Sequence, residues 1–155
     1  MTVVVDGSVL AAAVAHLGPD GTWSEAAIAD AGEKGSMAAP QMVLAEAGNA
    51  LRRMELTGNL PSFEAALAHR DLLTLEIELY PFAPLADRIW ELRHNITIYD
   101  AWYVALAEAL ACPLLTLDRR LARAPGPTCE IITPPDLRVV REPAVTSGWT
   151  PFSSG

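Results

Sequence analysis

The sequence predicts an α/β fold, a three-layer α/β/α sandwich around a central and mostly parallel sheet. Short apolar strands alternate with helical segments along the chain, which is the order that builds a parallel sheet covered by helices on both faces. The segments VVV at 3–5 and PLLTL at 113–117 are largely apolar, as expected of strands buried on both sides. The chain has 155 residues, 51% of them hydrophobic, which is enough for one domain with a full core.

The amino-terminal half is predicted to alternate strand and helix. After the strand at 3–5, SVLAAAVAH favours a short helix that ends at the turn GPDG. Thr22 with Glu25 forms a capping box, which predicts a helix from Thr22 to about Ala31. A short strand is expected within EKGSMAAPQ. The apolar positions of QMVLAEAGNALRRMEL then repeat at helical spacing until GNLP at 58–61 stops the helix.

The carboxyl-terminal half continues the alternation. A helix is predicted over 62–72, a strand over LEIELY and a further helix over 84–92. NITIYDAWYVALAEAL is apolar almost all round, which is typical of a fully buried helix. Its Tyr103 is expected in the core or in a dimer interface. The strand PLLTLD, the short helix RRLARA and the strand CEIIT complete the pattern.

These elements divide the chain into two parts. We expect one domain over residues 1–133, followed by a carboxyl-terminal extension over 134–155 that is partly disordered, because it is rich in Pro, Ser and Gly.

The composition restricts the class of function. The formal net charge of -8 argues against non-specific binding of nucleic acid through overall charge. No apolar run of about 18 residues occurs, so we expect no membrane span, and the amino terminus lacks the pattern of a signal peptide. Cys112 and Cys129 form no CxxC pattern, which argues against a zinc site. Two cysteines without a disulfide-like pattern favour a cytoplasmic protein.

Asp6 and Asp118 each follow a buried strand. Asp6 alone is explained as a helix cap, since its side chain can accept free backbone N–H groups. The carboxyl ends of parallel strands share one edge of a sheet, however, and ligand sites gather there. Two aspartates at matching strand ends therefore indicate a site.

Two further acids occupy informative positions. Asp100 places a charge on the apolar face that includes Val104; the alternative is that it completes a capping box with Thr97. Glu46 shares a helix face with Arg53, and a solvated surface explains it on its own. Its significance comes from the other three acids.

Carboxylate oxygens without paired His or Cys suit a hard cation, Mg²⁺ or Mn²⁺. Such sites support phosphodiester hydrolysis, in which one ion lowers the pKa of water and a second, about 4 Å away, stabilises the leaving oxygen. Without metal, carboxylates gathered in this way would repel one another and raise their own pKa values.

Four segments in order resemble the PIN-domain family, and within it the VapC-type toxins of bacterial toxin–antitoxin pairs: VVVDGSVL, AEAGNALRR, YDAWYVALAEAL and LLTLDRRLARA. The resemblance covers about Thr2 to Thr133. It implies a PIN-like fold and a Mg²⁺- or Mn²⁺-dependent endoribonuclease that acts as a toxin. It also implies a homodimer, an RNA substrate and a cognate VapB-type antitoxin as partner.

Carried over position by position, the resemblance implies an acidic metal-binding and catalytic pocket formed by Asp6, Glu46, Asp100 and Asp118. It also implies supporting polar groups at Ser8, Asn49 and Thr116. Gly7 stands where the family more often has Thr or Ala, a departure to which we assign no chemistry.

Arginines flank these motifs and are candidates for RNA phosphate contacts, because arginine pairs bidentately with phosphate oxygens. They are Arg52, Arg53, Arg119, Arg120 and Arg123.

Two other functions remain in competition. A phosphatase with Asp6 as nucleophile would need a second aspartate at position 8, where Ser8 stands. A non-catalytic PIN-fold scaffold for protein partners would be distinguished by the lack of a response to metal.

Overall fold

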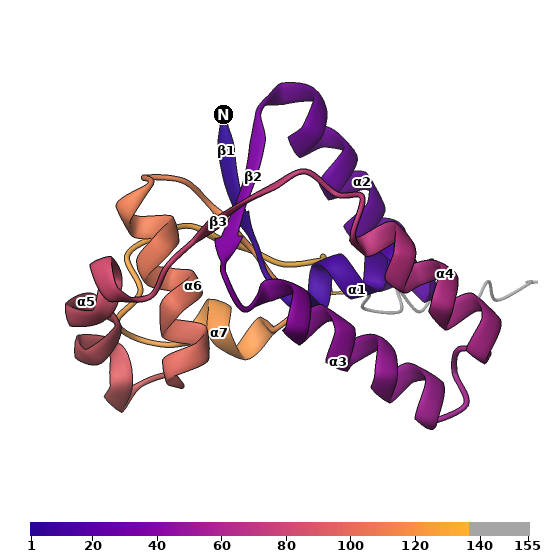
Figure 1. Cartoon of the computed structure of the whole chain (residues 1–155). Helices are drawn as coiled ribbons and strands as arrows, with labels where there is room; N and C mark the ends of the chain where they lie inside the picture. The colour runs from indigo at the N-terminus through magenta and orange to yellow at the C-terminus, as the bar shows by residue number, and fades with distance from the viewer. Residues whose placement is uncertain (137–155) are drawn as a thin grey trace, which may run out of the picture.

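The computed structural model describes residues 1–136, which contain a five-stranded sheet whose strands are all parallel (Figure 1). The strands are β1 (Thr2–Val5), β2 (Ser36–Pro40), β3 (Ile77–Tyr80), β4 (Leu114–Leu115) and β5 (Ile131–Ile132). The predicted α/β class is confirmed, and the sheet is parallel throughout rather than mostly so.

The strand order is β3-β2-β1-β4-β5, which places β1 in the centre. Val4 of β1 pairs with Ala38 of β2 on one side and with Leu114 of β4 on the other. The chain builds outward from β1 through β2 to β3, and then crosses back to add β4 and β5. The order therefore reverses between β1 and β4, and such a switch point opens a crevice outside the carboxyl ends of the two strands.

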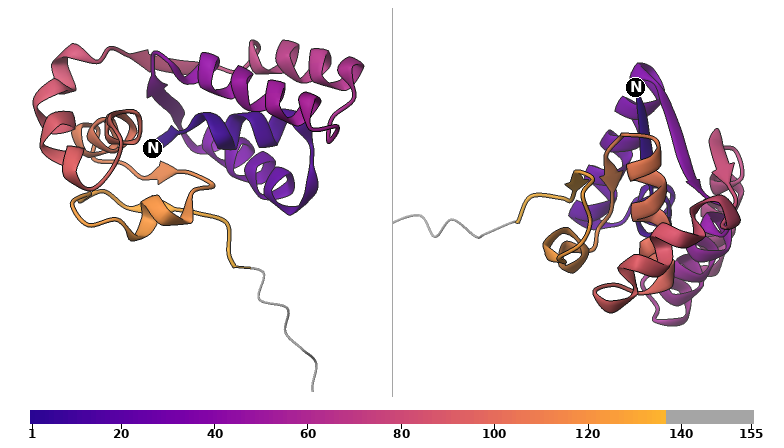
Figure 2. Two further views of the ribbon diagram at one scale, coloured as in Figure 1. Left: turned by 90° about the horizontal axis from the view of Figure 1, so that it is seen from below. Right: turned by 90° about the vertical axis from the view of Figure 1, so that its left-hand side faces the viewer.

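Helices flank the sheet, as the sandwich prediction requires (Figures 1 and 2). They are α1 (Gly7–Ala15), α2 (Gly18–Lys34), α3 (Val43–Leu56), α4 (Ser62–Leu72), α5 (Ala86–Glu91), α6 (Ile98–Ala109) and α7 (Arg119–Arg123), with short 3-10 turns η1 (Ala83–Leu85) and η2 (Leu92–His94). Helix α1 contacts α2, α3 and α4, whereas α5 packs on α6, which contacts β1, β2 and β4. None of the described helices has the length and apolarity needed to cross a bilayer.

The predicted start of α2 is wrong. The helix begins at Gly18 rather than at Thr22, so GPDG is its first turn and not a separate loop. Pro19 fits the first turn because its fixed φ is already helical and its missing N–H would have had no partner there. The Thr22 hydroxyl donates to the Gly18 carbonyl 3.3 Å away, one turn back inside the helix.

Helix α6 is buried as its apolar sequence predicted. Ala101 and the residues at 103–107 are all buried, although Tyr99 in the first turn is 68% exposed. Helix α1 is equally deep in the core. Apolar packing thus fixes both α1, which follows Asp6, and α6, which carries Asp100.

The carboxyl-terminal part of the described chain is tied to α7. Pro134 is buried, and Arg119 Nη2 donates to its carbonyl over 3.4 Å. Arg119 Nε lies 2.9 Å from Asp136 Oδ1, close enough for an ion pair although the N–H does not form a hydrogen bond. The extension predicted to be partly disordered lies, from residue 137 on, outside the described residues, and the boundary at 133 stays a prediction.

Candidate active site at the carboxyl edge of the sheet

Asp6 lies at the switch point and is only 8% exposed. Its Oδ1 accepts the Val9 N–H over 3.1 Å and the Ser8 hydroxyl over 2.6 Å, so it caps α1. Its Oδ2 accepts the Thr116 hydroxyl. The capping role weighed from the sequence is therefore confirmed, and it does not remove Asp6 from the edge where a ligand would bind.

Hydroxyl groups connect the ends of β1 and β4. Thr116 is fully buried and, besides donating to Asp6, accepts the Asp118 N–H over 3.0 Å. The Ser8 hydroxyl accepts the Leu117 N–H over 3.4 Å. The hydroxyls of Ser8 and Thr116, the polar groups that the resemblance implies, thus both donate to Asp6.

Asp118 caps the short helix α7. Its Oδ1 accepts the N–H groups of Arg120 and Leu121, over 2.8 and 3.3 Å. The side chain is otherwise exposed.

Glu46 is not on a freely solvated face, because the Tyr103 hydroxyl donates to its Oε2 over 3.0 Å. Tyr103 comes from α6 and is 1% exposed. Sequence reasoning placed Tyr103 in the core or in a dimer interface and missed this bond. The available signal was a polar atom on the buried face of α6, three residues after Asp100.

Asp100 lies in the first turn of α6, half-buried. Its N–H donates to the Thr97 hydroxyl oxygen over 3.1 Å, so the threonine half of the predicted capping box is present. Capping is thus performed by the Thr97 side chain and the Asp100 backbone.

The carboxyl groups influence one another electrostatically. Burial raises the pKa of Asp6, of Glu46 and of Asp100 above their ordinary values. Neighbouring charges add to the rise in pKa: Asp100 acts on Asp6, both of these act on Glu46, and Asp118 acts on Asp100. Hydrogen bonds from Ser8 and Thr116 hold down the pKa of Asp6, and Tyr103 does the same for Glu46. Thr97 holds down the pKa of Asp100. Each of the four predicted acids is thus within electrostatic range of at least one other, and we refer to Asp6, Glu46, Asp100 and Asp118 as the acidic cluster.

The cluster is not closed around an ion. Among residues 1–136, no three Asp, Glu, His or Cys side chains lie close enough together to hold a metal ion as they stand. Asn49 follows Glu46 by one turn of α3 and is exposed. Its predicted role stays a prediction.

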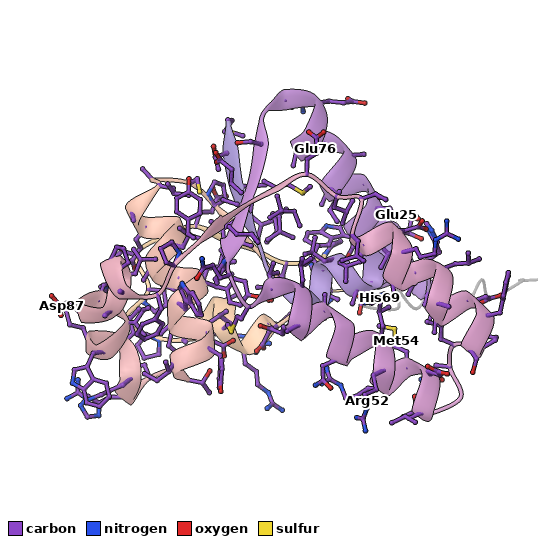
Figure 3. All side chains as sticks on the ribbon, in the orientation of Figure 1. Glu25, Arg52, Met54, His69, Glu76 and Asp87 are labelled. Atoms are coloured by element: carbon purple, nitrogen blue, oxygen red, sulfur yellow. The ribbon has the colours of Figure 1, made fainter. Side chains whose placement is uncertain are left out.

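The flanking arginines differ in their exposure and in the contacts that their side chains already make. Arg52 and Arg53 are exposed on α3, and Arg52 projects outward (Figure 3). Arg120 is exposed, and Arg123 Nε donates to the Arg119 carbonyl over 3.3 Å. Arg119 is engaged with Asp136 and with backbone carbonyls, so a phosphate would have to displace these contacts. Arg119 is thus the least suited of the five to bind RNA.

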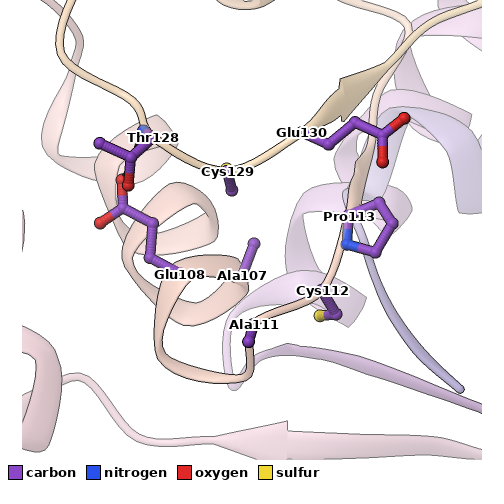
Figure 4. A pocket seen from close by; sticks show the side chains of 8 residues that line it. All are labelled: Ala107, Glu108, Ala111, Cys112, Pro113, Thr128, Cys129 and Glu130. Atoms are coloured by element: carbon purple, nitrogen blue, oxygen red, sulfur yellow. Dashed lines mark hydrogen bonds between the residues drawn. The ribbon is translucent and has the colours of Figure 1, made fainter.

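A cavity of about 290 Å³ lies at the opposite edge, before β4 and β5 begin (Figure 4). Cys112 and Cys129 line it as free thiols. The Glu108 carboxylate in its wall is bound by Arg88 and by the Thr128 N–H. The cavity contains no member of the acidic cluster and is not the candidate site.

The raised pKa of Asp6 predicts a pH-dependent cost of folding. The pKa of Asp6 in the folded protein lies above the ordinary 3.8. Protonated Asp6 carries no such cost below pH 3.8, and the free energy of unfolding then falls as the pH rises through the raised pKa. Asn at this position still caps a helix but has no charge to desolvate. Asp6→Asn should therefore gain stability relative to wild type between about pH 4 and about pH 7. Urea unfolding in EDTA measures the free energy of unfolding of both proteins. An equal difference between Asp6→Asn and wild type at the two pH values would contradict the prediction.

The fold and the acidic cluster together define a class of protein. It is an α/β domain with charged groups outside the carboxyl ends of β1 and β4, at the reversal of strand order, which is where ligands bind in open α/β sheets. The PIN domain model matches residues 3–127. The chain belongs to the PIN domain family.

Two curated relatives specify the branch of that family. Ribonuclease VapC1 of Mycobacterium tuberculosis is 51% identical over 94 residues, which is 60% of this chain and 71% of the relative. Ribonuclease VapC9 of the same species is 37% identical over 133 residues, 86% of this chain and 98% of the relative. The resemblance to VapC-type proteins is confirmed.

A solved structure supports the fold. VapBC2 from Rickettsia felis, bound to a DNA fragment from the promoter, matches with a TM-score of 0.62 at 17% identity. The match covers 86% of this chain and 98% of that chain.

Proposed function

We propose that this protein is a metal-dependent endoribonuclease that acts as the toxin of a toxin–antitoxin pair. The observation that carries the proposal is the acidic cluster at the switch point, where burial and mutual repulsion raise the pKa of three carboxyl groups. A bound dication would relieve this repulsion. The names of the relatives, ribonucleases VapC1 and VapC9, support RNA cleavage as the reaction.

The donor set fits Mg²⁺ or Mn²⁺, because it consists of carboxylate oxygens. Asp6, Glu46, Asp100 and Asp118 would hold the ion. Among residues 1–136 these carboxylates lie too far apart to hold an ion as they stand, so metal binding would have to bring them closer together. Bound there, the ion supplies an acidified water molecule and charge stabilisation for the leaving oxygen of a phosphodiester.

The chain's own groups prepare this site. Ser8 and Thr116 donate hydrogen bonds to Asp6, which fixes its orientation and favours its ionised form. The exposed arginines would contact RNA phosphates and position the strand. They are Arg52, Arg53, Arg120 and Arg123.

The partners follow from the same assignment. The VapBC2 structure contains its VapC together with VapB, which supports a VapB-type antitoxin as partner here. We further propose a homodimer, and a cytoplasmic location because the RNA substrate is found there.

Metal titration tests the proposed site. Saturating Mn²⁺ should raise the melting temperature of the wild-type protein by on the order of 5 °C, because a ligand that binds only the folded state stabilises it. Asp118→Asn still caps α7 and should lose this rise. Asp30→Asn, at an exposed ion pair with Lys34, is the matched control and should keep it. A flat response in the wild type would favour the non-catalytic scaffold.

A further inference from the structure

Tyr103 has a buried ring and a hydroxyl group that donates to Glu46 and lies beside the Gly7 backbone. The residue is 1% exposed and lies within the apolar core of α6. Its hydroxyl nevertheless reaches Glu46 Oε2 on α3, 3.0 Å away. Phenylalanine would fill the same space without a buried hydroxyl group that needs a partner. Core packing alone therefore does not explain a tyrosine here.

Glu46 is confined on a second side by Gly7. A Cβ at Gly7 would lie 3.0 Å from both Cβ and Cγ of Glu46 and 2.9 Å from the Ala47 nitrogen. The stem of Glu46 thus packs directly on the backbone that follows Asp6. A free glutamate side chain has several rotamers and loses conformational entropy when it is fixed. Contact at the stem and a hydrogen bond at the tip together supply that restraint.

The restraint joins two members of the acidic cluster. Asp100 and Tyr103 lie three residues apart on α6, a spacing that brings side chains onto neighbouring positions of a helix. The same rigid helix therefore sets the position of the Asp100 carboxylate and, through the Tyr103 hydroxyl, the orientation of the Glu46 carboxylate.

We propose that Tyr103 is a positioning residue that turns Glu46 toward the other carboxylates, using Oε2 as the anchor and leaving Oε1 available to a divalent cation. This inference rests on the proposed metal-dependent function. A buried side chain of α6 would thus orient a carboxylate of the proposed metal site.

The test compares Mn²⁺ binding by two Tyr→Phe variants of the full chain, measured from the electron paramagnetic resonance signal of free Mn²⁺. Tyr103→Phe should bind Mn²⁺ about tenfold more weakly than wild type, the usual effect of removing a group that orients a ligand. Tyr80→Phe is the matched control, since the Tyr80 hydroxyl also donates to a glutamate, Glu78, over 3.3 Å. It should bind as wild type does. Unaltered binding by Tyr103→Phe would overturn the proposal.

A double-mutant cycle separates positioning from a general loss of structure. In a Glu46→Ala background, Tyr103→Phe should cause a much smaller further loss of Mn²⁺ affinity, because the carboxylate that it orients is gone and only the Gly7 backbone beside Asp6 remains next to the hydroxyl. An equal tenfold loss in both backgrounds would overturn the proposal. Absence of Mn²⁺ binding and of RNA cleavage in the wild type would instead remove the proposed function, and the inference with it.

Discussion

Asp100→Asn should cleave RNA about a thousandfold more slowly than wild type, because metal-supported charge stabilisation contributes several kcal/mol to such a step. The substitution removes one charge and almost no volume. The backbone N–H of residue 100 would still donate to Thr97, so the cap of α6 is kept. Initial rates on a labelled RNA in Mn²⁺, together with circular dichroism of both proteins, measure the effect.

Asp87→Asn is the matched control for this experiment. Asp87 is exposed on α5 and points into solvent (Figure 3). The variant loses the same charge from the same acidic protein, so a difference between the two variants reports the site rather than the net charge. A folded Asp100→Asn protein that cleaves RNA at the wild-type rate would refute the assigned role of Asp100.

The fold could be predicted from local sequence wherever a local pattern decides the structure. Alternating strands and helices, and the apolar helix around Asp100, were sufficient for the parallel sandwich and its buried α6. The start of α2 could not be predicted from the Thr22 capping box, because Pro19 offers a competing start and both signals are local. Only packing in the folded chain decides between them.

Asp6, Asp100 and Asp118 could be proposed as site residues because each is an acid in a position that local structure makes costly or conspicuous, whereas Glu46 entered the set through the family resemblance. Their restraints could not be predicted in the same way. The bond from Tyr103 to Glu46 joins residues 57 positions apart, and the contacts of Arg119 with Pro134 and Asp136 are equally a product of the fold. No periodicity or spacing in the sequence encodes which buried hydroxyl meets which carboxylate.

Gly7 is the clearest case of a residue whose importance the sequence concealed. Its place in the first motif suggested no chemistry, yet the structure shows α3 packed directly against its backbone. Although the family more often has Thr or Ala at this position, α3 packs too close to Gly7 in this chain to admit a Cβ without moving. Gly7→Ala should therefore weaken Mn²⁺ binding and slow RNA cleavage by about a hundredfold, the loss that a displacement of about 1 Å can cause at a reacting site. The new Cβ would meet the Ala47 nitrogen and the Glu46 stem, and a backbone nitrogen in a packed helix cannot swing aside.

The same substitution has two opposed effects on stability, and their sizes decide the outcome. In a helix interior alanine is favoured over glycine by about 1 kcal/mol, and Gly7, as the first residue of α1, gains less. Forcing an extra methyl into a packed contact costs about 1–3 kcal/mol. We therefore expect Gly7→Ala to be net destabilised in urea unfolding. Gly32→Ala supplies the control, because a Cβ there meets nothing within 4 Å; it should be stabilised and fully active. Wild-type Mn²⁺ affinity in a stable Gly7→Ala protein would show that Glu46 is not held at this contact.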